Sequence, residues 1–171
     1  MKERFEWGDL GNIEQGRPTL GSWTNVSAYR LLYFTLRQVL NSQLGKEKSR
    51  EIFVAAGKLA GQEVFLNLVG EVTDFSDLMI KVDTIFNDLK VGIFKVEEAD
   101  EKKMRFLLTI SEDLDCSGVS VDGETKCAWD EGLIAGLLSS FLKVMPTVKE
   151  IDCWATGAGI CRFEVKIEQT S

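Results

Sequence analysis

The stretch that decides the fold runs from Glu124 to Glu168 and reads ETKCAWDEGLIAGLLSSFLKVMPTVKEIDCWATGAGICRFEVKIE. An apolar run of helical length follows Cys127, and Pro146 ends it. Two short strands joined by a glycine-containing turn come next, and the second alternates apolar and polar residues from Cys161 onward. The stretch therefore predicts a helix packed on a β-hairpin.

The residues before this stretch predict three helices and a first hairpin. Apolar residues recur at helical spacing in 26–40, 52–68 and 75–89, with Asn25 or Ser27 capping the first helix and Asp74 or Ser76 the third. The pattern then changes to a period of two in 91–97 and 104–111. The order ααα-ββ-α-ββ is typical of an α+β domain, with an antiparallel four-stranded sheet covered by helices.

Domain organisation follows from the same pass along the chain. Glycine and proline punctuate residues 1–24, which predict an irregular N-terminal arm, so we expect a single domain over 25–171. Within the second helix, Gly57 and Gly61 are four residues apart, although each glycine costs a helix about 1 kcal/mol against alanine. We interpret the pair as the close approach of another helix, with a ligand on that face as the alternative.

Composition excludes several classes of protein. The formal net charge of −7 argues against a nucleic-acid-binding surface, which needs clustered lysine and arginine. We found no apolar run of the roughly 18 residues that a membrane helix needs, and the charged N-terminus has no signal core. We therefore expect a cytoplasmic protein without a membrane span, a setting that also disfavours disulfides between the four cysteines.

Histidine is absent from the chain. This removes the commonest general base and the commonest metal ligand, together with any Ser-His or Cys-His nucleophile pair. Metal-binding chemistry would have to use the cysteines and nearby carboxylates.

Three of the cysteines are predicted to converge. Cys153 and Cys161 flank one hairpin turn, and Cys127 lies at the start of the helix that packs on that hairpin. Zinc sites of the structural type take four such ligands in a tetrahedron. We expect a zinc ion here, while three small buried hydrophobic residues remain the alternative.

Spacing leaves the fourth ligand open. Strand parity places Ile151 with Cys153 and Glu150 on the opposite face, so Glu150 reaches the metal only if the strand is bulged. Cys116 in the preceding loop offers a softer ligand, and it is also the best placed of the four for a redox role.

These residues resemble the V4R (4-vinyl reductase-like) domain over about 104–168. The matching pattern is Cys127 with its apolar helix, Glu150-Ile-Asp-Cys153, Gly157, and Cys161-Arg-Phe-Glu-Val. The chain is also similar to the sensor domains of phenol-responsive transcription activators, whose fold is shared by TRAPP-type tethering subunits and heme-nitric-oxide sensors. The resemblance implies a zinc ion held by Cys127, Glu150, Cys153 and Cys161, and it favours Glu150 over Cys116.

The resemblance further implies a hydrophobic ligand pocket between the helices and the sheet, lined by Phe53, Phe65, Phe75, Phe86, Phe106 and Phe141. Phenol sensors hold the ligand hydroxyl with a histidine and a tryptophan. Counted back from Cys127, those positions fall near Leu78 and Phe106 here. Because both are apolar, we expect a ligand other than phenol.

The sequence thus favours a ligand-binding or sensing domain that is a homodimer and signals through a protein partner. A tetrapyrrole-binding or 4-vinyl reductase-like protein is one alternative, and a helical interaction module of the tethering type is another. No GxGxxG fingerprint is present, and zinc saturated by protein ligands leaves no catalytic position, which favours a protein that is not an enzyme.

Overall fold

The computed structural model describes residues 4–100 and 102–168. The chain divides into two compact units, Met1–Ser49 and Arg50–Ser171. The first unit is helical, and the second contains the sheet with the helices that cover it. The expected boundary between an arm and a domain at residue 24 stays a prediction.

The first unit consists of short helical turns and one long helix. A 3₁₀ turn at Trp7–Leu10 and helix α1 (Ile13–Gly16) lie within the predicted arm, and helix α2 spans Val26–Leu44. The Asn25 side chain accepts the backbone N–H of Ser27 at 2.8 Å, which satisfies a donor that the helix leaves free. Gly45 follows with φ 83°, a conformation that favours glycine, and ends the helix.

The second unit contains one antiparallel sheet of four strands in the order β1-β2-β4-β3. The strands are β1 (Ile93–Asp100), β2 (Arg105–Ser111), β3 (Thr147–Asp152) and β4 (Cys161–Lys166). In β4 the inward residues Cys161, Phe163 and Val165 are completely buried, as the alternation in the sequence predicts. The α+β class and the antiparallel four-stranded sheet are therefore confirmed.

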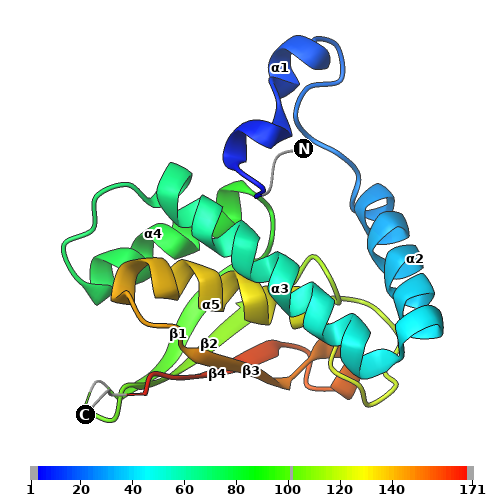
Figure 1. Ribbon diagram of the computed structural model, residues 1–171. Helices are drawn as coiled ribbons and strands as arrows, with labels where there is room; N and C mark the ends of the chain where they lie inside the picture. The colour runs from blue at the N-terminus through cyan, green and yellow to red at the C-terminus, as the bar shows by residue number, and fades with distance from the viewer. Residues whose placement is uncertain (1–3, 101, 169–171) are drawn as a thin grey trace. The chain divides into compact units, whose positions relative to one another are not determined.

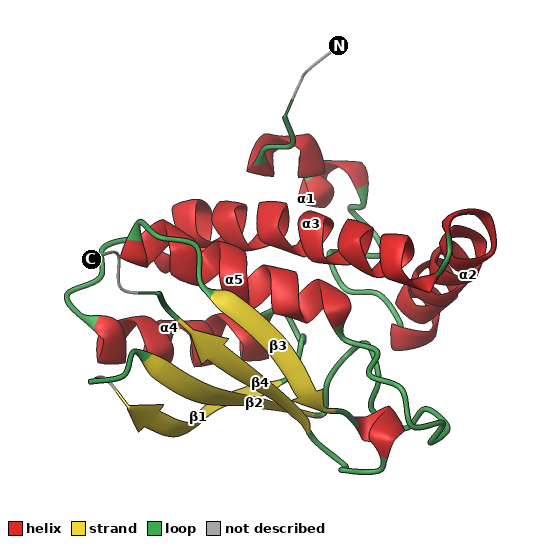
Figure 2. Ribbon diagram, turned by 60° about the horizontal axis from the view of Figure 1, so that its bottom comes forward, coloured by secondary structure: helices red, strands yellow, loops and turns green. Residues whose placement is uncertain are grey.

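Helices cover one face of this sheet. Helix α4 (Phe75–Asp88) lies against β1, and helix α5 (Ala128–Leu142) lies against β3 (Figures 1 and 2). Because α5 is apolar on all sides, it needs cover on both faces. Helix α3 (Lys46–Val64), continued by a π-helical turn at Phe65–Val69, supplies that cover on the side of α5 away from the sheet.

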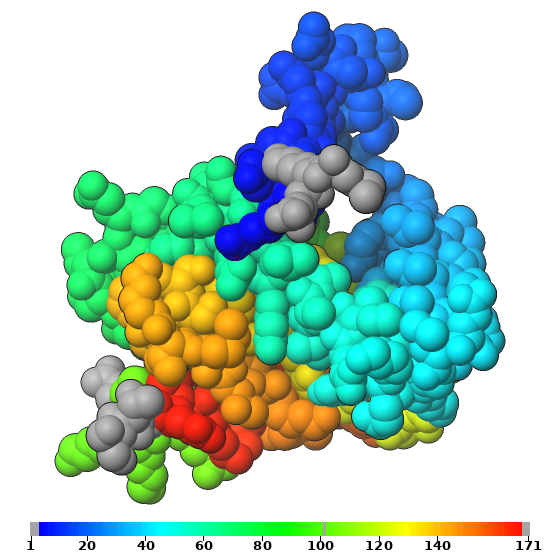
Figure 3. All heavy atoms as spheres, in the orientation of Figure 1, coloured from blue at the N-terminus to red at the C-terminus, as the bar shows by residue number. Residues whose placement is uncertain are grey.

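Four glycines bring α3 and α5 together. A methyl group on Gly57 would overlap the carbonyl oxygen of Trp129, and one on Gly61 would overlap that of Leu133. Gly132 and Gly136 of α5 are equally tight against the α3 backbone. The space-filling view shows the two helices in direct contact (Figure 3). Close helix approach is therefore the reason for the glycine pair in the sequence, as predicted.

The same helix bears on the membrane question. Among the described residues, the stretch Lys46–Val69 is long and apolar enough to cross a membrane, a test that core helices also pass. From Arg50 onward this helix packs against α5 within the second unit. The absence of a membrane span stays a prediction.

Candidate metal centre and ligand pocket

Four cysteines meet at one end of the sheet, and we call them the thiol cluster: Cys116, Cys127, Cys153 and Cys161. All four side chains are free thiols and completely buried. Cys127 immediately precedes α5, where its carbonyl accepts the N–H of Glu131 at 3.1 Å. The start of an apolar helix thus fixes the first thiol.

Cys153 and Cys161 are positioned by the turn between β3 and β4. Thr156 closes this turn, since its hydroxyl accepts the N–H of Cys153 at 3.0 Å and donates to the carbonyl of the same residue at 2.8 Å. Gly157 then adopts φ 93°, which allows the chain to reverse into Cys161. The hairpin brings the two thiols to the same corner, as the spacing predicts.

A bulge decides where Glu150 points. The pairing of β3 with β4 shifts register between Glu150 and Asp152, so Ile151 is the extra residue. Ile151 is 48% exposed while Glu150 is only 2% exposed. The predicted parity, with Ile151 beside Cys153, was therefore wrong. The distortion that would let Glu150 reach the cluster is present.

Cys116 lies in the loop between β2 and α5, and hydrogen bonds within this loop fix its position. Oδ1 of Asp113 accepts the backbone N–H of Asp115 at 2.8 Å and that of Cys116 at 3.1 Å. The Asp113 carbonyl accepts the N–H of Ser117 at 3.0 Å. These bonds hold Cys116 against the hairpin, 3.1 Å from the Cys161 sulfur.

The thiols are close enough to surround one ion. Cys127 Sγ lies 3.6 Å from Cys161 Sγ and 4.0 Å from Cys153 Sγ, and all four sulfurs lie within 4.8 Å of one another. A zinc ion with bonds of roughly 2.3 Å to sulfur would place tetrahedral ligands about 3.8 Å apart. The spacing of the cluster fits such an ion.

Protonation in the cluster is strongly coupled. Hydrogen bonds from Cys116, Cys127 and Cys161 lower the pKa of Cys153, while the contact with Cys116 raises the pKa of Cys161. These shifts favour ionisation of Cys153 and oppose ionisation of Cys161. A divalent cation would remove that restriction, because thiolates are the metal-binding form.

Glu150 borders the cluster as a buried carboxyl group. Its Oε2 accepts the backbone N–H of Cys127 at 2.9 Å, and its Oε1 has no hydrogen-bond partner among the residues that the structure describes. Burial, followed by the charge of Cys153, raises the pKa of Glu150 to about 9. An orphaned oxygen beside four thiols is a further sign that a cation belongs here.

Sequence reasoning missed the other carboxylates near the cluster. The polar composition of residues 112–126 is typical of a solvated loop, but Asp113 and Asp115 are only 1% and 2% exposed. Asp130 of α5 is buried too, and burial together with Asp113 and Asp115 raises its pKa well above the usual range. The only signal in the sequence was the run Asp-Leu-Asp directly before Cys116.

A pocket of about 490 Å³ opens at the other end of the helical layer. Its walls come from the start of α4, the start of β2 and the end of α5, and they include Phe75, Phe106 and Phe141 of the six predicted pocket residues. The rings of Phe75 and Phe106 stack with centroids 4.4 Å apart. Met104 and Leu142 complete the apolar lining, and Asp74 and Ser76 are its polar residues.

The remaining predicted pocket residues lie elsewhere. Phe86 borders a cavity of only about 10 Å³ between α4, α5 and the sheet. Leu78 is completely buried in the core. Phe53 and Phe65 line neither of these spaces. Of the six predicted residues, only Phe75, Phe106 and Phe141 thus line a space of ligand size among the pockets formed by described residues.

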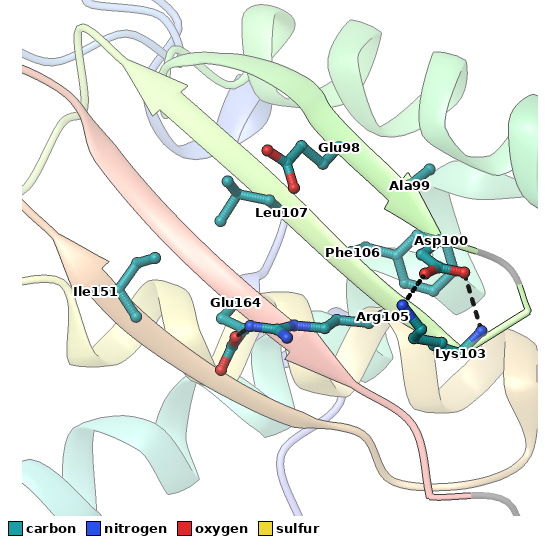
Figure 4. Close-up of a pocket in the computed structure, with 9 residues that line it drawn as sticks. All are labelled: Glu98, Ala99, Asp100, Lys103, Arg105, Phe106, Leu107, Ile151 and Glu164. Atoms are coloured by element: carbon teal, nitrogen blue, oxygen red, sulfur yellow. Dashed lines mark hydrogen bonds and ion pairs between the residues drawn. The ribbon is translucent and has the colours of Figure 1, made fainter.

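A second pocket, of about 370 Å³, lies on the sheet face away from the helices (Figure 4). Leu107 and Ile151 form its apolar part, while Arg105 pairs with Glu164 and Lys103 with Asp100. This pocket is therefore lined mainly by charged side chains, four of which form two ion pairs.

Comparison with known proteins gives the family. Residues 106–167 match the V4R domain. A relative from Methanocaldococcus jannaschii, MJ0150, is 30% identical over 160 residues, which cover 94% of this chain and 86% of the relative. The chain belongs to the V4R domain family.

Solved structures share the fold at low sequence identity. The phenol-responsive sensory domain of the transcription activator PoxR with phenol superposes with a TM-score of 0.66 at 18% identity, over 84% of this chain and 74% of that one. A trafficking protein particle complex subunit 3 from Naegleria fowleri, covalently bound to palmitic acid, superposes with a TM-score of 0.67 at 13% sequence identity. The match covers 85% of this chain and 96% of that one. An H-NOX domain from Shewanella oneidensis superposes with a TM-score of 0.59 at 16% sequence identity, over 96% of this chain and 88% of that one.

Proposed function

We propose that this protein is a ligand-sensing domain that binds a hydrophobic small molecule in the Phe75–Phe106–Phe141 pocket, and that the thiol cluster holds a structural zinc ion. The observation that carries the proposal is the pocket itself. Its volume of about 490 Å³ lies within the range of roughly 300–1,000 Å³ that small-molecule sites occupy.

The lining of the pocket indicates the kind of ligand. Three phenylalanines with Met104 and Leu142 offer apolar contact area, and the polar lining residues Asp74 and Ser76 both come from the start of α4. A ligand with an apolar body and one polar end matches this distribution. The PoxR domain was solved with phenol and the tethering subunit with palmitic acid, so both chemistries occur in this fold.

Zinc in the thiol cluster would serve structure rather than catalysis. Four buried thiols surround the site, which is enough to fill a tetrahedral ion without an open position. Such an ion would join the loop at Cys116, the start of α5 and the β3–β4 hairpin.

The tetrapyrrole alternative has less support from the residues. The relative in the H-NOX fold was solved in an Fe(II)CO ligation state, but this chain has no histidine to serve as an axial ligand. A divinyl porphyrin remains a useful probe, because binding followed by reduction would assign the 4-vinyl reductase-like activity instead.

The test uses native mass spectrometry followed by titration. We expect the purified protein to carry a bound hydrophobic molecule or to bind palmitic acid with micromolar affinity after delipidation. Phe141→Trp should fill the pocket and weaken binding at least tenfold, whereas Phe5→Trp, at a position 37% exposed, should leave binding unchanged. Equal affinity of the Phe141→Trp variant and the wild type for palmitic acid, phenol and divinyl porphyrin would sink the pocket assignment.

We also propose that the protein is a homodimer that signals through a protein partner. Helix α2 exposes Leu32, Leu36 and Val39 at spacings of four and three, which form one face. A second copy would cover this face. Leu36→Glu should convert the dimer to a monomer in light scattering, while the matched Ile80→Glu on α4 should not. A wild-type protein that is monomeric at micromolar concentration contradicts the proposal.

A further inference from the structure

We infer that Cys116 supplies the fourth thiolate of the metal site, and that Glu150 is a positioning residue that holds Cys127 from outside the ligand set. The inference rests on the proposed zinc site and names its donor set as four sulfurs. It departs from the three-cysteine, one-glutamate set that the resemblance to the V4R family implied.

The sulfur positions favour four thiolates. Cys116 Sγ belongs to the group of ligand atoms that lie within 4.8 Å of one another, and the three measured contacts in this group run from 3.1 to 4.0 Å. These values bracket the edge of about 3.8 Å expected for a tetrahedral zinc–sulfur site. No segment has to move for an ion to reach all four sulfurs.

The backbone around Cys116 is already built for ligation. Asp113 Oδ1 accepts the N–H of Cys116 at 3.1 Å, and Glu150 Oε2 accepts the N–H of Cys127 at 2.9 Å. Each of these two thiols is therefore oriented by one buried carboxyl group. The parallel assigns Glu150 the same task as Asp113, which is outer-shell orientation of a ligand residue.

Glu150 is the direct competitor for the fourth position. Its Oε1 lacks a hydrogen-bond partner among the described residues, but no Glu150 oxygen belongs to the group of ligand atoms that lie within 4.8 Å of one another, whereas Cys116 Sγ does. Zinc prefers the softer thiolate when both donors are within reach. The site then holds four sulfurs in contact with the ion and one carboxyl group behind Cys127.

The decisive measurement needs no variant. X-ray absorption at the zinc edge of the purified wild-type protein should show four sulfur neighbours at about 2.3 Å. Three sulfurs with one oxygen would overturn the inference and leave the zinc proposal standing. Protein with four reduced thiols that takes up no zinc would overturn both.

Cobalt(II) substitution separates the roles of the two residues. Cys116→Ser should lower the sulfur-to-cobalt charge-transfer absorption by about a quarter. Glu150→Gln keeps an acceptor for the Cys127 N–H and should leave this absorption unchanged. Glu150→Ala should keep the spectrum but weaken cobalt binding by about 10–100-fold, the usual range for loss of an outer-shell partner. A Glu150→Gln spectrum that changes while that of Cys116→Ser does not would reverse the assignment.

Discussion

Oε1 of Glu131 accepts the backbone N–H of Glu150 at 2.7 Å, so that a buried side chain of α5 holds β3 at its bulge. The same carboxylate pairs with Arg50 of α3, and Lys149 lies 3.9 Å from it. Glu131 therefore joins two helices to the strand that carries Glu150 toward the thiol cluster. It links the stability of the fold to the geometry of the thiol cluster.

Loss of Glu131 should be costly. Glu131→Ala leaves the Glu150 N–H without its acceptor and Arg50 without this partner. We expect the free energy of unfolding to fall by about 2–3 kcal/mol. This is less than the roughly 3–5 kcal/mol for breaking a fully buried ion pair, because Arg50 is partly exposed. Lys149→Ala is the control, since its long, exposed contact should contribute less than about 1 kcal/mol. Urea unfolding measures both, and equal values for the two variants would refute this role.

Gly57 should tolerate no side chain. A methyl group there would overlap the Trp129 carbonyl oxygen, which is backbone and cannot rotate away. We expect Gly57→Ala to destabilise the protein by about 1–3 kcal/mol or more, through separation of α3 from α5. Gly16→Ala meets nothing within 4 Å and should be neutral or stabilising. Urea midpoints that match for the two variants would contradict the packing argument.

Removal of the metal should lower the melting temperature. If zinc is present at about 100 times its dissociation constant, it contributes about 2.7 kcal/mol. For a chain of this size, that amounts to a shift of about 5–10 °C. Calorimetry before and after chelation, and again after zinc is restored, measures the shift. Cys153→Ser should show a lower melting temperature and no response to zinc, and a wild-type protein indifferent to chelation would argue against a structural ion.

Asp74 should stabilise α4 as its N-cap. Its Oδ1 accepts the N–H of Asp77 at 2.9 Å, which satisfies one of the free donors of the helix. We expect Asp74→Ala to cost about 1 kcal/mol and Asp74→Asn to restore most of it. Because Asp74 also borders the ligand pocket, the two variants should be compared for palmitic acid binding as well as for thermal unfolding.

Local patterns were sufficient for the elements and for part of the site. The alternation from Cys161 to Ile167 and the caps at Asn25 and Asp74 depend on neighbours within a few residues, so the sequence contains them. The approach of Cys127, Cys153 and Cys161 followed from one helix start and one hairpin. Each of these is short-range geometry.

The route of the loop from Glu112 to Lys126 was not accessible in this way. Its composition is polar, and the expected result is a solvated loop, yet Asp113, Asp115 and Cys116 are buried. Their burial depends on hydrogen bonds and sulfur contacts to residues such as Cys161, 45 positions away from Cys116. No local period encodes a contact of that range.

The sequence by itself determined an α+β chain without histidine and with a strictly alternating final strand. It also predicted that three cysteines meet where the start of a helix packs on a hairpin. Tertiary structure alone decided that Ile151 bulges outward, that Glu150 turns inward, and that Cys116 joins the thiol cluster. The physical reason is that periodicity reports which face of an element is buried, whereas a bulge and a folded loop are selected by the partners that they meet across the molecule.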